Sequence, residues 1–282
     1  MYSVVFETDN GKKFIFGREN GNVFDMDLGK SVSVDIGTSQ GFGQIGETVQ
    51  TQAVGSRLIT VKGVIYENIS KQRKNIRNIC APFTSGRLIF QNEYEINVYV
   101  KDPPSFSTVK NDGRYSMSFF APYPYFSSIR EEKRTIGAIE PMFHFPINYS
   151  APHKFGEKGA ARYTNIYNAG DVKIPFSVTI TTSGTSTNVT LTNLQTLEFL
   201  KLNGSLSSGD KVEIYKDKNN ILRAELTANG TTSDIISWID EDSSLFELSV
   251  GDNLINADDE EGGNSIEVFL NYKKAVVAVY ED

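Results

Sequence analysis

Short runs in which apolar and polar residues alternate follow one another along most of the chain. Val32, Val34 and Ile36, for example, are separated by polar residues. A period of two places apolar side chains on one face of a strand, and turn signals such as the Asp-Asn-Gly sequence at residues 9–11 separate the runs. In the first part of the chain this pattern predicts strands at residues 2–8, 14–16, 32–36, 57–66, 88–90, 94–101 and 115–120.

One long stretch, residues 37–54, breaks this pattern because it is rich in glycine and holds no long apolar run. It is predicted to be a loop or an extended arm. Its segment Gly41-Phe42-Gly43-Gln44-Ile45-Gly46 has the spacing of a glycine-rich phosphate loop, but such a loop must open a helix, and the residues that follow lead to another strand. We therefore interpret Gly41, Phe42 and Gly43 as part of a loop whose backbone can adapt to a neighbouring subunit.

The pattern predicts one helix, at residues 71–80, with Ser70 as its N-cap. Ile76 and Ile79 fall on one face, and Pro82 ends the helix. The rest of the surface is basic and fits either a solvated face or a contact with an acidic partner surface. Its basic residues are Lys71, Arg73, Lys74 and Arg77, of which Arg73, Lys74 and Arg77 are candidate interface residues.

Composition divides the chain into two domains and a connector. Prolines punctuate residues 128–159, which we interpret as a linker between an N-terminal domain at residues 1–127 and a C-terminal domain at residues 160–282. The C-terminal part is rich in Thr, Ser and Asn, with turns spaced as in sandwiches and jelly rolls. The strands expected here are residues 176–182, 188–191, 196–202, 211–215, 221–227, 244–248 and 267–280, the last assigned to this domain on continuity alone. The predicted fold class is all-β with one short helix.

Charge and composition exclude several classes of protein. The formal net charge is −7, and the acidic excess lies in residues 151–282. Because phosphate binding needs a basic stripe, tight binding of nucleic acid is not expected. A single cysteine, Cys80, excludes a disulfide scaffold. The sequence shows neither a secretory signal nor an apolar run of about 18 residues, so membrane insertion is not expected.

Candidate chemistry is sparse. The two histidines, His144 and His153, lie in the proline-rich connector, a poor place for a preorganised catalytic base, and only Glu140 and Glu157 are nearby candidates for a shared metal site. Acidic clusters at residues 240–242 and 258–261 lack the spacing of a calcium loop and are interpreted as solvated turns. The lone Trp238 is no evident sugar-binding platform. We expect no catalytic residue, no metal and no cofactor.

The order of elements resembles a known family. Residues 57–65, the basic helix, Pro82, the Gly-Arg-Leu sequence at 86–88 and the phrase at 118–126, which ends in Pro-Tyr-Pro-Tyr-Phe, are similar to the N-terminal domain of the distal tail proteins of long-tailed phages that infect Gram-positive bacteria. Residues 168–171, 174–176, 201–204, 206–210, 212–215 and 246–253 are similar to that family's second domain. The resemblance covers nearly the whole chain.

The resemblance implies a virion structural protein and no enzyme. In this family, N-terminal β-sandwich domains form a hexameric ring at the tip of the tail tube, and C-terminal galectin-like jelly-roll domains project outward. The implied partners are further copies of the chain, the tail tube protein and a tail-tip or receptor-binding protein, with DNA passing through the ring. The second domain is too short for a large receptor-binding insertion. The alternative function is binding of host cell-wall polysaccharide by the galectin-like domain, and an enzyme acting on glycans ranks third.

Overall fold

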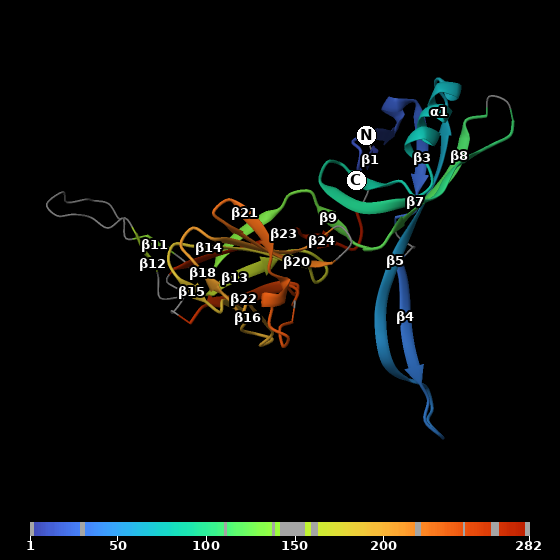
Figure 1. Ribbon diagram of the computed structural model, residues 1–282. Helices are drawn as coiled ribbons and strands as arrows, with labels where there is room; N and C mark the ends of the chain where they lie inside the picture. Colours follow the sequence, from blue (N-terminus) through green and yellow to red (C-terminus); the bar gives the residue numbers. More distant parts are fainter. Residues whose placement is uncertain are drawn as a thin grey trace, which may run out of the picture. The chain divides into compact units, whose positions relative to one another are not determined.

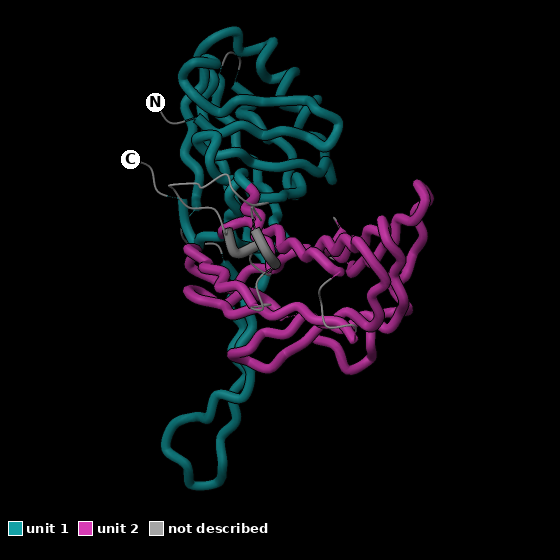
Figure 2. The backbone as a smooth tube through the Cα atoms, turned by 90° about the vertical axis from the view of Figure 1, so that its left-hand side faces the viewer, with its two compact units in different colours: residues 1–130, 275–282 teal, residues 131–274 magenta. Residues whose placement is uncertain are grey.

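The computed structural model describes residues 3–28, 32–109, 112–136, 139–141, 156–158, 163–217, 221–244, 246–260 and 265–279. The chain divides into two compact units, one of residues 1–130 and 275–282 and the other of residues 131–274 (Figures 1 and 2). Both are built from antiparallel strands, which confirms the predicted all-β fold.

A ten-stranded sheet forms the first unit. Its main path runs β2-β1-β6-β7-β8-β5-β3, and β4, β9 and β24 pair beside that path. Strands β2 and β3 lie at the two ends of this path. They nevertheless approach each other: the ring centroids of Phe16 in β2 and Phe24 in β3 lie 5.8 Å apart. The sheet therefore curls around one core of buried aliphatic and aromatic side chains. The strands are β1 (Val4–Thr8), β2 (Lys13–Phe16), β3 (Asn22–Met26), β4 (Val32–Ser39), β5 (Thr48–Ile65), β6 (Ser85–Phe90), β7 (Tyr94–Phe106), β8 (Arg114–Ala121), β9 (Phe126–Ser128) and β24 (Ala275–Val276).

The predicted helix is present as α1 (Ile69–Ile79) and buries Ile76 and Ile79 in this core. The predicted N-cap was wrong: the cap is Asn68, two residues before Ser70, in a left-handed conformation with φ 49°. Asparagine tolerates this conformation better than most residues, so the chain turns into the helix earlier than the Ser70 signal indicates. A 3-10 turn, η1 (Arg18–Asn20), joins β2 to β3.

Two main sheets form the second unit, with orders β10-β23-β14-β19-β20-β21 and β13-β22-β16-β17. Alternate residues of their strands are buried, as in β22 and β23, so each sheet has one buried face, as in a sandwich. The strands of the two main sheets are β10 (Glu132–Ile136), β13 (Tyr163–Asn168), β14 (Phe176–Thr182), β16 (Thr190–Asn193), β17 (Phe199–Lys201), β19 (Lys211–Lys216), β20 (Leu222–Ala228), β21 (Thr231–Asp234), β22 (Gly251–Asp258) and β23 (Ile266–Tyr272). The small pairs are β11 (Ile139–Pro141) with β12 (Gly156–Lys158) and β15 (Ser186–Thr187) with β18 (Ser205–Leu206), and η2 (Ile236–Trp238) is a 3-10 turn.

The unit boundaries differ from the expected domains at two places. Within the expected connector, β10 pairs with β23 over five residue pairs and so belongs to the second unit. The predicted final strand, residues 267–280, is divided: β23 stays in the second unit, whereas β24 pairs with β9 in the first. Continuity along the chain gave the wrong assignment for Ala275 and Val276, because their pairing partner lies about 150 residues earlier in sequence.

Candidate assembly surfaces

The expected arm is a two-stranded ribbon that projects from the first unit. Strand β4 pairs with β5 from Val32 opposite Arg57 to Ser39 opposite Thr48. Strand β5 joins β8 only from Arg57 onward and joins β3 only from Val61 onward, so residues 48–56 pair with β4 alone among the described strands. The ribbon leaves the sheet at Arg57 and points away from α1 (Figure 1). Of the two alternatives for residues 37–54, the structure shows the extended arm.

The arm has one apolar face and one polar face. Val34 and Val54 are cross-strand partners and therefore point to the same side, as does Ile36 two residues beyond Val34. All three side chains are more than half exposed. Ser33 and Asp35 point to the other side. An isolated two-stranded ribbon is marginally stable in water, so an apolar face on such a ribbon indicates a surface that another chain covers.

The tip of the arm, residues 40–47, is an ordered turn built around Gln44. The backbone N–H of Gly41 donates to Oε1 of Gln44 at 2.9 Å, and Nε2 of Gln44 donates to Oγ1 of Thr48 at 2.9 Å. Gly43 has φ 75°, in the left-handed region that glycine adopts without strain. This turn leaves Phe42 and Ile45 fully exposed. The predicted residues Gly41, Phe42 and Gly43 thus display an apolar tip.

Charge on the arm is entirely acidic. Between residues 32 and 56 the sequence contains Asp35 and Glu47 but neither lysine nor arginine. Glu47 is exposed and has no ion pair among the described residues. Any surface that receives the arm should therefore be apolar with a basic rim.

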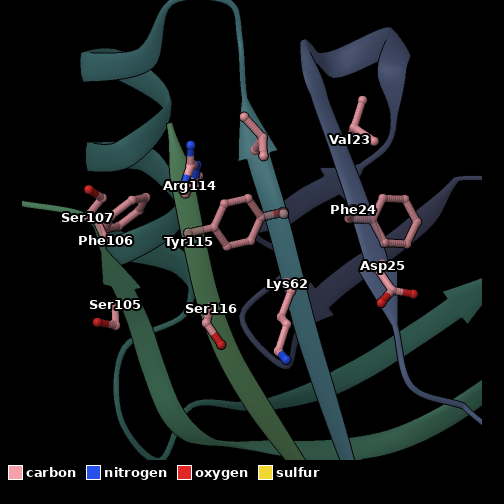
Figure 3. A pocket seen from close by; sticks show the side chains of 12 residues that line it. Val23, Phe24, Asp25, Lys62, Ser105, Phe106, Ser107, Arg114, Tyr115 and Ser116 are labelled. Atoms are coloured by element: carbon pink, nitrogen blue, oxygen red, sulfur yellow. The ribbon is translucent and has the colours of Figure 1, made fainter. Parts of the chain in front are cut away.

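A groove of about 680 Å³ lies on the first unit, across β3, β5, β8 and the end of β7 (Figure 3). Val23 and Val64 are cross-strand partners in its lining, and both are partly exposed. Lys62 also lines the groove, is exposed, and has no ion pair among the residues that the structure describes. Arg114, whose side chain is 79% exposed, pairs with Asp112 at 3.6 Å. The groove is therefore apolar, with the basic side chains of Lys62 and Arg114 on β5 and β8 and the exposed carboxylate of Asp25 on β3, opposite Lys62.

Tyr115 lies under the groove, and its ring packs across Gly63. A Cβ atom on Gly63 would lie 2.5 Å from the hydroxyl oxygen of Tyr115, so only glycine fits at this place in β5. Burial raises the pKa of Tyr115, and the pKa of the neighbouring Cys80 thiol rises to about 12 for the same reason. Both groups are neutral at physiological pH and belong to the core rather than to a reactive site.

The predicted basic helix residues divide into two kinds. Arg73 is bound within the unit: Nη2 donates to the carbonyl oxygen of Ser107 at 2.7 Å, and its guanidinium lies 4.8 Å from the ring centroid of Phe106. Arg77 also lies 4.8 Å from that centroid. Lys74 is exposed, and the described residues contain no ion-pair partner for it. Arg73 and Arg77 therefore hold the end of β7 against α1, and of the three candidate interface residues of the helix it is Lys74 that offers an uncommitted charge.

The two predicted interface sets are not brought together. Gly41, Phe42 and Gly43 lie at the tip of the arm, whereas α1 lies at the opposite end of the first unit (Figure 1). Sequence reasoning missed the groove altogether, because its lining comes from strands that are distant along the chain. The cross-strand pair of Val23 and Val64 is visible only once the register of β3 and β5 is known.

Arg57 fixes the base of the arm. Its side chain is buried, with Nη1 donating to the carbonyl oxygen of Leu28 at 2.6 Å and Nη2 donating to that of Val277 at 2.7 Å. The guanidinium also lies 4.7 Å from the ring centroid of Phe126 in β9. Desolvation lowers the pKa of Arg57. This arginine connects the point where the arm leaves the sheet with the returning C-terminal segment.

The acidic clusters that the sequence singled out in the second unit form hydrogen bonds to nearby side chains. Asp259 accepts a hydrogen bond from Oγ of Ser186 at 2.7 Å. Asp240 accepts one from Nδ2 of Asn203 at 2.8 Å, and that bond lowers the pKa of Asp240. Among the described residues no group of three or more His, Cys, Asp and Glu side chains could hold a metal ion.

His144 and His153 lie outside the described residues. The described part of the chain has no helix long and apolar enough to cross a membrane.

Trp238 is half-buried. A Cβ atom on Gly204 would lie 2.2 Å from its indole ring, so the ring packs directly against that backbone. Two other aromatic residues are exposed. Tyr163 and Tyr167 lie on the outward face of β13, with Asn165 between them on the same face. Nδ2 of Asn165 donates to Oδ1 of Asp252 at 2.8 Å on the neighbouring β22. The sequence interpretation overlooked these tyrosines.

Comparisons with known proteins found one matching family model and similar solved structures. Residues 169–275 match the family described as "Siphovirus-type tail component, C-terminal domain". The SPP1 Dit protein matches with a TM-score of 0.66 and 12% identity, over 97% of this chain and 99% of that chain. Two structures of the phage P2 baseplate in its activated conformation, with Ca and with Sr, match at TM-scores of 0.47 and 0.46, with 13% identity over 96% of this chain and 97% of the matched chains. No curated protein sequence gives a significant match.

Residues 169–275 are therefore similar to a siphovirus-type tail component domain, and the chain shares its fold with the SPP1 Dit protein. The resemblance to distal tail proteins that the sequence indicated is confirmed.

Proposed function

We propose that this protein is a structural hub at the distal end of a siphophage tail, in a virion, a prophage or a phage-tail-like particle, and that it acts through interfaces rather than by catalysis. Six copies form a ring around a channel through which DNA passes. The ring joins the tail tube protein to a tail-tip or receptor-binding protein. It is assembled in the cytoplasm of the bacterial host and resides at the tail tip.

One observation carries this proposal: the fold matches over 97% of the chain to a protein described as a paradigm of the hub adsorption apparatus in phages that infect Gram-positive bacteria. The family match at residues 169–275 supports it from sequence. Both units take part in the fold match, so the likeness is not confined to a common sandwich domain.

The length of the arm is consistent with the proposed ring. Residues 48–56 extend the ribbon by about 30 Å beyond the sheet, at about 3.3 Å per residue, a reach similar to the diameter of a compact unit of this size. A tip that far from its own core contacts another molecule. When each copy uses one surface to hold a different surface of its neighbour, the contact repeats until the ring closes.

The charge distribution suits a channel for DNA. Residues 1–150 carry nearly equal numbers of basic and acidic side chains, 17 against 15, and no basic stripe follows the strands of the first unit in the sequence. A lumen that does not neutralise phosphates allows DNA to pass without being held.

The ring is tested by light scattering on the purified chain, with negative-stain images of the same fraction. A mass near six times 31.3 kDa and an open ring are expected. Replacing residues 40–47 with a short Gly-Ser turn should reduce the mass to that of a single chain. An arm-deleted chain that still forms the ring would show that the arm is not its assembly element.

The outward face of β13 favours a second candidate function, the binding of host cell-wall polysaccharide. Tyr163 and Tyr167 are four residues apart on one strand, about 13 Å in an extended chain, with the amide of Asn165 between them. Exposed aromatic rings pack against the apolar faces of sugars, and paired amide and carboxylate groups hydrogen-bond sugar hydroxyls.

This second function is tested by retention of the full chain on purified cell walls of Gram-positive bacteria. Replacement of both Tyr163 and Tyr167 by serine should abolish retention, whereas replacement of Tyr66, an exposed tyrosine of the first unit, should not. Equal retention of all variants, or no retention of the parent chain, excludes sugar binding by this face. Released sugar from the same cell walls would instead indicate an enzyme.

A further inference from the structure

A closed ring of identical copies needs two different complementary surfaces on each copy. The arm supplies one, because its tip displays Phe42 and Ile45 on an ordered turn. The second surface must accept two apolar side chains. In the ring it belongs to the next copy, on its first unit or on a part beside that unit.

The groove across β3, β5 and β8 has the required shape and chemistry. Its volume of about 680 Å³ is enough for two large side chains, and Val23 and Val64 give it an apolar lining (Figure 3). Val64 lies opposite Arg114 of β8. In the next cross-strand row, Lys62 lies between Asp25 of β3 and Ser116 of β8. The apolar lining and the basic side chains therefore lie next to each other.

The groove lining has one more basic than acidic side chain, Lys62 and Arg114 against Asp25. The arm contains only acidic charges, and Glu47 lies two residues beyond Ile45. On the groove, Lys62 is exposed, and neither it nor Glu47 has an ion-pair partner among the described residues. Two exposed opposite charges that lack partners within one chain can neutralise each other between two chains.

We propose that the arm tip of one copy docks in the groove of the next copy, with Phe42 and Ile45 against Val23 and Val64, and with Glu47 beside Lys62. The contact is head-to-tail, so its repetition builds the ring. This inference rests on the proposed ring and identifies the surface that receives the arm.

Cross-linking tests the contact in the full chain. Phe42→Cys combined with Ser116→Cys should give a ladder of covalent oligomers with a short bismaleimide, because each copy then carries one reactive site on the tip and one beside Lys62. Phe42→Cys with Asn97→Cys is the matched control, since Asn97 is an exposed residue of β7 outside the groove. The native Cys80 is buried and should not react.

Charge exchange tests the same contact by a second route. Glu47→Lys and Lys62→Glu should each raise the concentration for half-assembly by about two- to five-fold, and the double variant should restore it. Phe42→Ser should raise it by more than about ten-fold, since aromatic anchors dominate most interfaces. All three residues are exposed, so these variants should keep the melting temperature of the parent chain.

The outcomes separate this inference from the proposed function. If the parent chain forms rings but the two cysteine pairs give equal ladders, and charge exchange gives no rescue, the arm docks elsewhere and the inference is overturned while the ring stands. If the parent chain forms no oligomer and no ladder, both are overturned. If Phe42→Ser leaves the ring intact but releases another tail protein from assembled tails, that protein occupies the tip and the inference is wrong.

Discussion

Arg57 donates a hydrogen bond from Nη2 to the carbonyl oxygen of Val277, which lies 220 residues further along the chain, at 2.7 Å. The same side chain donates from Nη1 to Leu28, immediately before the chain enters the arm. The base of the arm and the returning C-terminal segment therefore share one buried cation. Arg57 is also the first residue of β5 to pair with β8, so this buried side chain lies at the point where the arm leaves the sheet.

Replacement of Arg57 by methionine should lower the free energy of unfolding of the first unit by about 2–4 kcal/mol, because the buried carbonyl of Leu28 and the partly buried carbonyl of Val277 lose a charged donor. Chemical denaturation followed by a probe in that unit measures the change. Arg114→Met is the control: its side chain is 79% exposed, and the expected change is below about 0.5 kcal/mol. Equal stability of the two variants would show that Arg57 contributes no more than a surface arginine.

Deletion of residues 275–282 should destabilise the first unit and spare the second. Ala275 is buried and pairs with Ser127 of β9, and Val276 and Val279 pack against the core of the first unit. Hydrogen exchange resolved by segment is the measurement. Loss of protection is expected in β9 and at the base of β5, with β14 and β23 unchanged. Loss confined to β14 and β23 would contradict the division into units.

Acid should weaken the first unit through Glu7. Hydrogen bonds from Arg87 and Lys13 hold the pKa of Glu7 below its ordinary value. A carboxyl group with a lowered pKa in the folded state stabilises that state above its unfolded pKa of about 4.3, and this contribution is lost as pH falls through the folded pKa. The Glu7→Gln variant should melt lower at pH 7 and show a smaller loss of Tm between about pH 5 and pH 3.

Glu19→Gln is the matched control for that experiment, because Glu19 is exposed and the described residues give it no ion pair. Its Tm profile should follow that of the parent chain. A Glu7→Gln profile parallel to the parent profile down to pH 3 would exclude Glu7 as the source of the acid sensitivity.

Charge reversal on α1 should separate folding from assembly. Arg73→Glu removes the bond to the Ser107 carbonyl and the contact with Phe106, so it should lower the Tm of the first unit. Lys74→Glu changes only an exposed charge and should leave the Tm unchanged. If the basic helix face is an interface, Lys74→Glu lowers the yield of assembled particles, and a normal yield removes α1 from the set of interfaces.

Local patterns predicted much of the fold. Alternation gave β14 at residues 176–182 without error, and the apolar spacing placed α1 within two residues of its observed ends. By contrast, β22 was missed, because Gly251-Asp252-Asn253 reads as a turn when its pairing with β13 is not known. Strand β24 was assigned to the wrong unit because no local signal records that it pairs with β9.

The candidate surfaces show the same limit. The tip residues Gly41, Phe42 and Gly43 were found from sequence because a glycine-rich turn around an apolar residue is a local signal. The sequence could not show that Arg73 makes contacts within the unit whereas Lys74 is exposed, because Arg73 contacts Phe106, which lies 33 residues further along the chain. The groove needed the register of three strands before its residues could be recognised as neighbours.

The central claim is that identical copies close into a six-membered ring. The most direct test is the mass of the purified chain by light scattering, with negative-stain images of the same fraction. The account predicts a species near six times 31.3 kDa that appears as an open ring. A chain that stays monomeric at every concentration tested, or that closes with a different number of copies, would contradict it.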